Sequence, residues 1–287
     1  MNSPRVLSRF FANASSRRPS WSTLASGARL AVALVVVPLA GCLKSVNENS
    51  NATKYGAIAV TGIPVANGNG AASASAIFFQ AFSVNIPDSR LQSNGCQFAS
   101  VDTTQAASTG QLKAGTALSM IVGSGATTTA RELGYDLANL RYQSSAVLYK
   151  ANDSITVSIP GDAAGFPASS IKLRLAEPLF PEDVTVPTGS DKMTVRWNAS
   201  SDTTTAIILS LRYANPPSST YANEQLICAL KDDGAEDITG TVLGPFTLSP
   251  VGMRSLKLTR WRTNLVLPGD AAVLHIVSTI DTLVKLK

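Results

Sequence analysis

Apolar and polar residues alternate along much of this chain after residue 54, and this period of two constrains the fold more than any other feature. In Ser154–Ile159 and in 171–175 every second residue is apolar, so one face of each segment suits burial and the other suits water. Gly, Pro, Asn and Asp separate most such segments, which is typical of sandwiches and barrels. The sequence therefore predicts an all-β fold. Further strands are expected at 55–60, 76–84, 117–122, 193–197, 206–213, 225–230, 255–261 and 271–280.

One segment has a helical pattern instead. Leu133, Leu137 and Leu140 lie on one face of a helix if residues 131–141 are helical. Gly134 within this segment weakens a helix. A single short helix at 131–141 is therefore expected among the strands.

The first 41 residues have the layout of a secretory signal. They hold five arginines and no acidic residue, followed by an apolar run at 30–39 and small residues before Cys42. The run is about half of the ~20 residues that a helix needs to cross a bilayer core. Pro38 further disfavours a spanning helix. A helix buried in the protein core is the alternative interpretation.

The sequence Leu39-Ala40-Gly41-Cys42 resembles the lipobox of bacterial lipoproteins. The resemblance implies that the Cys42 thiol carries a diacylglyceryl group, that residues 1–41 are removed, and that the new amino group is acylated. Two or three acyl chains hold a protein firmly at a membrane, whereas one holds it marginally. Leu43 stands where Gram-negative lipoproteins retained at the inner membrane have Asp, which implies the outer membrane.

Charge argues against nucleic acid as a partner. The chain has 24 basic and 19 acidic residues, and removal of the five arginines before Cys42 leaves 19 of each. A neutral mature chain lacks the surplus of Lys and Arg that binds phosphates. The densest basic cluster is expected to be a solvated strand face rather than a site for an anionic ligand, and it comprises Arg254, Lys257, Arg260 and Arg262.

Four regions follow from these patterns. They are a signal peptide at 1–41, a lipidated polar tether at 42–54, a first β domain at 55–180 and a second at 188–287. The tether would reach roughly 20 Å. Three prolines at 177–190 mark the boundary. The second unit has about the length of one immunoglobulin-like or fibronectin-like sandwich, and this likeness is one of architecture alone.

Cys96 and Cys228 remain once Cys42 is lipidated. An oxidising compartment outside the cytoplasm permits one disulfide between them, although they lie on opposite sides of the proposed boundary. Two separate buried thiols are the alternative.

The other chemistry-bearing residues are expected to be structural. His275, the one histidine, lies between apolar residues, and no Gly-x-Ser-x-Gly motif supplies a nucleophile. The acidic run at 232–237 fits a hairpin turn around Asp-Gly better than a calcium loop. Four aromatic residues could form a surface for sugar stacking or partner binding, namely Trp197, Trp261, Tyr213 and Tyr221. Trp197 is in phase with core residues, so we expect it to be buried instead. No metal site, cofactor or catalytic residue is identified.

The sequence therefore predicts a non-catalytic lipoprotein of the cell envelope. Its partners would be the membrane, through the anchor, and a protein or carbohydrate ligand held by loops on a rigid scaffold. A membrane-tethered hydrolase with an unlocated carboxylate pair and a purely structural envelope component are the alternatives.

Overall fold

The computed structural model describes residues 54–80, 95–100, 111–188, 191–269 and 271–287. The lipobox, Cys42 and the polar tether at 42–54, apart from Lys54, lie outside these ranges. The end of the strand expected at 76–84 also lies outside them. None of the helices in the described ranges has the length and apolarity needed to span a membrane.

The described residues form mostly strands, which confirms the predicted β class. Thirteen strands form one mixed sheet in the order β3-β12-β11-β14-β15-β1-β2-β6-β5-β4-β8-β9, with β7 paired to β2, while β10 and β13 form a separate pair. The strands are β1 (Lys54–Pro64), β2 (Gly70–Gln80), β3 (Gly95–Ser100), β4 (Ala117–Ser124), β5 (Thr127–Asp136), β6 (Arg141–Gln143), β7 (Val147–Tyr149), β8 (Ser154–Ile159), β9 (Ser169–Arg174), β10 (Met193–Arg196), β11 (Ala206–Tyr213), β12 (Glu224–Lys231), β13 (Ala235–Ile238), β14 (Ser255–Val266) and β15 (Ala272–Val284).

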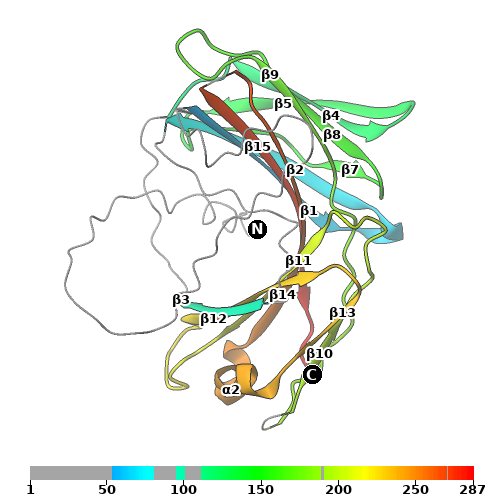
Figure 1. Cartoon of the computed structure of the whole chain (residues 1–287), viewed down its shortest axis with the longest axis vertical. Coiled ribbons are helices and arrows are strands. Elements are labelled where there is room, and N and C mark those ends of the chain that lie inside the picture. Colours follow the sequence, from blue (N-terminus) through cyan, green and yellow to red (C-terminus); the bar gives the residue numbers. More distant parts are fainter. Residues whose placement is uncertain (1–53, 81–94, 101–110, 189–190, 270) are drawn as a thin grey trace, which may run out of the picture.

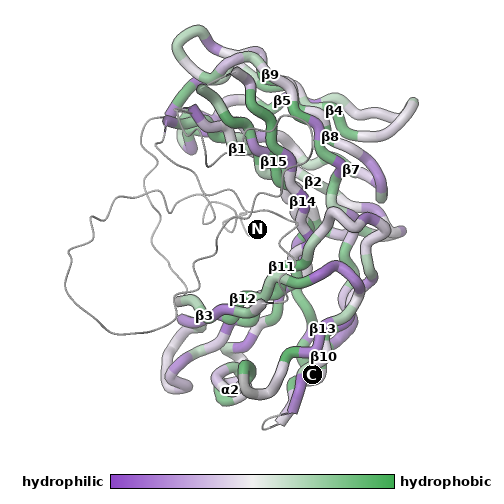
Figure 2. The backbone as a smooth tube through the Cα atoms, in the orientation of Figure 1, coloured by the Kyte–Doolittle hydropathy of each residue, from purple (hydrophilic) through white to green (hydrophobic). Residues whose placement is uncertain are grey.

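Three short helices complete the described elements: η1 (Ala66–Gly68), α2 (Gly240–Leu248) and η2 (Val251–Met253). Figure 1 shows β4, β5, β8 and β9 in the upper half of the molecule, and α2 with β10 and β13 in the lower half. The long strands β14 and β15 connect the two halves. Hydrophobic and hydrophilic residues are interleaved along the strands of both halves (Figure 2).

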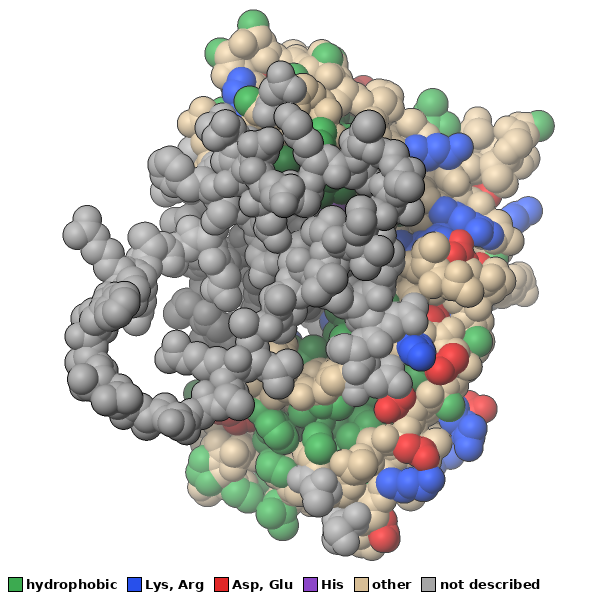
Figure 3. All heavy atoms as spheres, in the orientation of Figure 1, with side chains coloured by type: hydrophobic (Ala, Val, Ile, Leu, Met, Phe, Trp, Pro, Cys, Tyr) green, Lys and Arg blue, Asp and Glu red, His purple; other side chains and the backbone are tan. Residues whose placement is uncertain are grey.

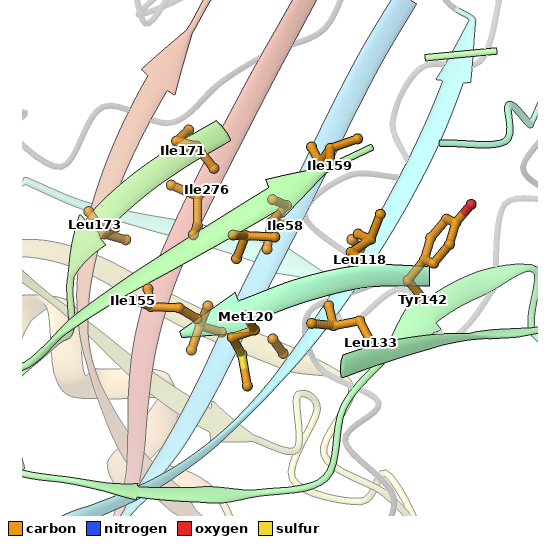
Figure 4. Close-up of a cluster of buried hydrophobic side chains, with 14 of the residues drawn as sticks. Ile58, Leu118, Met120, Leu133, Tyr142, Ile155, Ile159, Ile171, Leu173 and Ile276 are labelled. Carbon is orange, nitrogen blue, oxygen red and sulfur yellow. The ribbon is translucent and has the colours of Figure 1, made fainter. Parts of the chain in front are cut away.

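The upper half encloses the first hydrophobic core. Side chains from β1, β2, β4, β8, β9 and β15 meet there, and Figure 4 shows Ile58, Met120 and Ile276 among them. Strand β9 also lies against β14 and β15, so this part of the sheet curls back towards its own centre. The alternating residues of Ser154–Ile159 behave as the sequence predicts, with Ile155, Val157 and Ile159 buried.

The lower half encloses a second core. One face of β11, β12 and β14 packs against residues of β10, α2 and the segment that follows β9. Leu243 and Phe246 of α2 are both buried in this core. Trp197 also lies in it, which confirms its interpretation as a core residue.

The two cores divide close to the predicted domain boundary. Leu175 belongs to the first core and Ala176 to the second. However, β15 contributes to both, with Ile276 in the first core and Ile280 in the second. Strand β15 also pairs in parallel with β1, so strands from both predicted units share one sheet. The division into domains 55–180 and 188–287 stays a prediction.

The helix predicted at 131–141 is wrong. Residues Thr127–Asp136 form β5, which pairs with β4 from Thr127 to Gly134 and with β6 from Gly134 to Asp136. Leu133 is buried, whereas Leu137 and Leu140 are exposed, so the three leucines do not share a buried face. The run of β-branched residues before Leu133 favours a strand, and tertiary pairing outweighs the spacing of the leucines.

The turn at 232–234 is present, but it does not form a hairpin. The strand after it, β13, pairs with β10 instead of with β12. Gly234 has φ of 103°, which a glycine adopts without steric cost. Its carbonyl accepts a hydrogen bond from the Trp197 backbone amide at 2.9 Å. The acidic run therefore leads the chain from the large sheet to the small one.

Candidate functional site

The structure joins Cys96 and Cys228 in a disulfide across 132 residues of chain. Cys96 lies in β3 and is exposed, while Cys228 lies in β12 with 0% of its surface exposed. The two residues stand directly opposite each other in the antiparallel pair of β3 and β12. The disulfide therefore attaches an edge strand from the first predicted unit to the sheet of the second.

We expect loss of this disulfide to destabilise the protein by about 5 kcal/mol, the chain-entropy value for a loop of this length. The Cys96→Ser variant, or reduction of the native protein, provides the test. Urea unfolding followed by tryptophan fluorescence measures the change in unfolding free energy. The Cys42→Ser variant keeps both disulfide sulfurs and serves as the control. An unchanged unfolding midpoint under reducing conditions would contradict a stabilising role.

A buried ion pair lies where the two cores meet. Arg260 of β14 is 0% exposed, and its guanidinium donates to both carboxylate oxygens of Asp232, at 2.6 and 2.9 Å. It also donates to the backbone carbonyls of Glu177 and Pro178, at 3.1 and 2.9 Å, and to that of Asn198. The carboxylate and these carbonyls surround the buried charge with acceptors, as burial requires.

The Asp232 carboxylate also accepts hydrogen bonds from other side chains. The indole Nε1 of Trp197 donates to Asp232 at 2.9 Å, and the hydroxyl of Thr205 donates to the same carboxylate at 2.8 Å. Asp232 thus orients Arg260 towards the start of the 177–190 segment.

A second ion cluster lies beside the first. Asp202 accepts hydrogen bonds from Arg262 and, at 2.8 Å, from Arg174 at the end of β9. Burial opposes ionisation of Asp202, yet the hydrogen bonds from Thr204 and Arg262 hold its pKa at about 2. Because Arg174 belongs to the upper half, this cluster also links the two halves.

The prediction of a solvated basic face is therefore wrong for β14. Arg260 and Arg262 point to the core side of the strand, where fixed carboxylates neutralise them. Lys257 points to the other side and pairs with Asp281 at 3.3 Å. Arg254 precedes β14 and lies near α2. The four basic residues thus have three different environments.

Replacing Asp232 with Asn leaves the buried Arg260 charge without its counterion. We expect the free energy of unfolding to fall by about 3–5 kcal/mol, since breaking a buried pair strands a charge in a site of low polarity. The matched control is Asp237→Asn, which removes the exposed partner of Lys192 and should change stability little. Chemical denaturation of both variants makes the comparison. Equal stability of the two variants would contradict the assigned role.

His275 is a buried residue of β15 and lies opposite Ala57 of β1. Its Nε2 is within hydrogen-bond distance of the Thr263 hydroxyl on β14. Burial lowers the pKa of His275 to about 4, so the imidazole is neutral near pH 7. This environment agrees with the structural role expected from its apolar neighbours.

The lowered pKa of His275 predicts acid sensitivity in a defined range. The unfolded chain takes up a proton near pH 6.5, whereas the folded chain does so only near pH 4. The contribution of His275 to the free energy of unfolding is therefore fully present above pH 6.5, and about 3 kcal/mol of it is lost as the pH drops to 4. Denaturation at successive pH values measures this loss. In the His275→Gln variant the loss between these values should disappear, and its persistence would contradict the assignment. The stabilisation that comes from ionised Asp202 is lost at a lower pH than this, because its pKa is about 2.

The aromatic residues considered for ligand binding separate into two groups. Tyr213 is buried in the second core beside Phe246, and Trp261 is buried on β14, so neither forms an open surface with Trp197. Tyr221 is exposed in the segment between β11 and β12. The structure does not bring these four residues together in one patch.

A hollow at the end of the lower half is the candidate binding site. It has a volume of about 500 Å³ and lies between α2, the 186–188 segment and the chain end. Leu248, one of the residues that line it, is 72% exposed. Figure 3 shows hydrophobic side chains gathered at this end of the molecule. The residues lining the hollow are Val186, Pro187, Thr188, Gly244, Thr247, Leu248, Arg254 and Lys287.

Sequence reasoning did not find this hollow. The helix α2 contains Gly244 and Pro245, which are poor helix formers, so its segment carries no helical signal. The walls of the hollow come from three stretches that are far apart in the chain, and only the fold brings them together. Exposed large apolar residues such as Leu248 cannot be distinguished from core residues by type alone.

Comparison of the sequence with known proteins does not assign the chain to a family. No model of a known protein family matches the chain, and no curated protein sequence matches it. Within the described ranges, no three or more His, Cys, Asp and Glu residues come together in a group that could hold a metal ion.

Proposed function

We propose that the mature protein is a lipoprotein of the cell envelope, anchored through Cys42, that acts as a non-catalytic binding module. The sequence Leu39-Ala40-Gly41-Cys42 after an apolar run carries the anchor part of this proposal. The apolar hollow at the α2 end carries the binding part. Leu43 favours the outer membrane as the site of the anchor.

The tether would attach at one end of the folded body, and the hollow lies at the other, which supports separate anchoring and binding roles. Lys54, where the polar tether meets β1, donates from Nζ to the Gly165 carbonyl between β8 and β9, in the upper half. The hollow is lined in part by residues of α2, and α2 lies in the lower half (Figure 1). A body tethered at one end presents its opposite end away from the membrane. The hollow is then accessible to a soluble ligand or a partner.

The finer architecture is part of the proposal. The lower half would be a sandwich unit in which β11, β12 and β14 form one layer, and β10, β13 and α2 form the facing layer around the second core. The hollow then lies at one end of the sandwich, where the loops of such folds carry recognition.

Replacing Cys42 with Ser should abolish both incorporation of labelled palmitate and retention in the membrane fraction, since the acceptor thiol is lost. The matched control is Cys96→Ser, which also removes one thiol and should leave lipid labelling intact. Mass spectrometry of the purified native protein should show a chain that begins at a lipid-modified Cys42. Palmitate incorporation that persists in the Cys42→Ser variant would contradict the anchor.

A further inference from the structure

We propose that the hollow at the α2 end binds a single anionic group, best a carboxylate, carried on a short apolar chain. This inference names the ligand class for the binding module proposed above and therefore rests on that function. It depends on the walls of the hollow and on the fixed position of one arginine.

The walls provide an apolar environment for the body of the ligand. Val186 and Pro187 line the hollow on the side of the 186–188 segment, and Gly244 and Leu248 line it on the side of α2. Gly244 has open space where a side chain would project, so the helix leaves room there. A volume of about 500 Å³ is within the usual range for small-molecule sites, which are mostly apolar with a few polar groups.

Arg254 is held in place before any ligand binds. Its Nε donates to the Ser249 carbonyl at 2.7 Å, and its Nη2 donates to the Thr247 carbonyl at 2.6 Å. The guanidinium carbon lies 5.8 Å from the centre of the Phe246 ring. These contacts with the end of α2 fix the plane of the guanidinium. A ligand therefore does not bear the entropy cost of ordering this long side chain.

The charge of Arg254 is not neutralised by these contacts. Its two hydrogen-bond acceptors are carbonyls, and none of the acidic residues in the described ranges forms an ion pair with it. This distinguishes Arg254 from Arg260 and Arg262, whose charges are paired with buried carboxylates. An arginine has five N–H donors in a planar fork, so donors remain for an anion.

The second cationic side chain at the hollow, that of Lys287, already has an acidic partner. Lys287 pairs with Asp183 at 2.8 Å, and Lys285 approaches the same carboxylate at 3.9 Å. The charged side chains that line the hollow are Arg254 and Lys287, both positive. One uncompensated guanidinium beside an apolar cavity fits one negative charge. A planar carboxylate matches the guanidinium fork.

Isothermal titration of the full processed protein with octanoate tests the proposal, and octanamide serves as a neutral probe of the same shape. We expect octanamide to bind at least tenfold more weakly than octanoate, because only the carboxylate forms a charge-assisted bond with Arg254. A short peptide ending in leucine, with a free or an amidated carboxyl group, tests a peptide end as the source of the same chemistry. Preference for the free carboxylate in either pair supports the proposal.

The Arg254→Met variant keeps an unbranched apolar stem and removes the guanidinium and its charge, so octanoate affinity should fall at least tenfold. The Arg254→Lys variant keeps the charge without the fork and should show an intermediate loss. Arg131→Met is the matched control on the exposed face of β5, and its octanoate affinity should be unchanged. Thermal unfolding of each variant shows whether it is folded. Where Arg254→Met does not fold, the comparison of charged and neutral probes on the native protein decides.

Equal binding of charged and neutral probes overturns the proposal, as does the absence of binding by both carboxylates. An unchanged octanoate affinity in a folded Arg254→Met variant also overturns it. None of these results bears on the lipid anchor, which palmitate labelling of Cys42 tests separately. Failure of the ligand assignment is thus distinguishable from failure of the proposed lipid anchor.

Discussion

The ion pair between Arg260 and Asp232 is the interaction on which the joint between the two halves depends. Both side chains lie in a region almost closed to solvent, where removing two charges from water costs several kcal/mol per ion. The structure offsets this cost with hydrogen bonds from Trp197 and Thr205 to the carboxylate and with carbonyl acceptors for the guanidinium. Such a cluster tolerates little displacement, since any movement of the 177–178 backbone leaves a buried donor without its acceptor. The two cores are therefore held in one relative position.

The sequence predicts the strands well where one face is buried, because an alternating pattern reports burial directly. Ser154–Ile159 and 206–213 are of this kind. Pairing between distant strands leaves no such local signal, so the parallel pair of β1 and β15 could not be derived. Arg260 shows another limit. Its position in the alternation of β14 pointed inward, but its charge suggested water, and its counterion lies 28 residues away in the chain. The helix expected at 131–141 failed because three leucines spaced for a helix do not reveal that β4 pairs with this segment.

For the candidate site, the sequence predicted the core positions of Trp197 and His275 and allowed the Cys96–Cys228 disulfide as one of two alternatives. The anchor at Cys42 stays a prediction. The sequence did not supply the hollow, whose walls join residues from 186 to 287. The same fold gives Arg254 a different role from that of its neighbours on β14. Arg260 and Arg262 are neutralised inside the joint, while Arg254 is oriented by carbonyls at the molecular surface. If the chain is anchored through Cys42 as proposed, the end of the body at α2 is the part that remains available for recognition.

The shared sheet and the buried ion pairs make the two cores one cooperative unit. Differential scanning calorimetry of the purified protein at neutral pH tests this most directly. A single transition with equal calorimetric and van't Hoff enthalpies is the predicted result, because β15 belongs to both cores and cannot leave one without disturbing the other. Two resolved transitions, or a calorimetric enthalpy well above the van't Hoff value, would contradict the account.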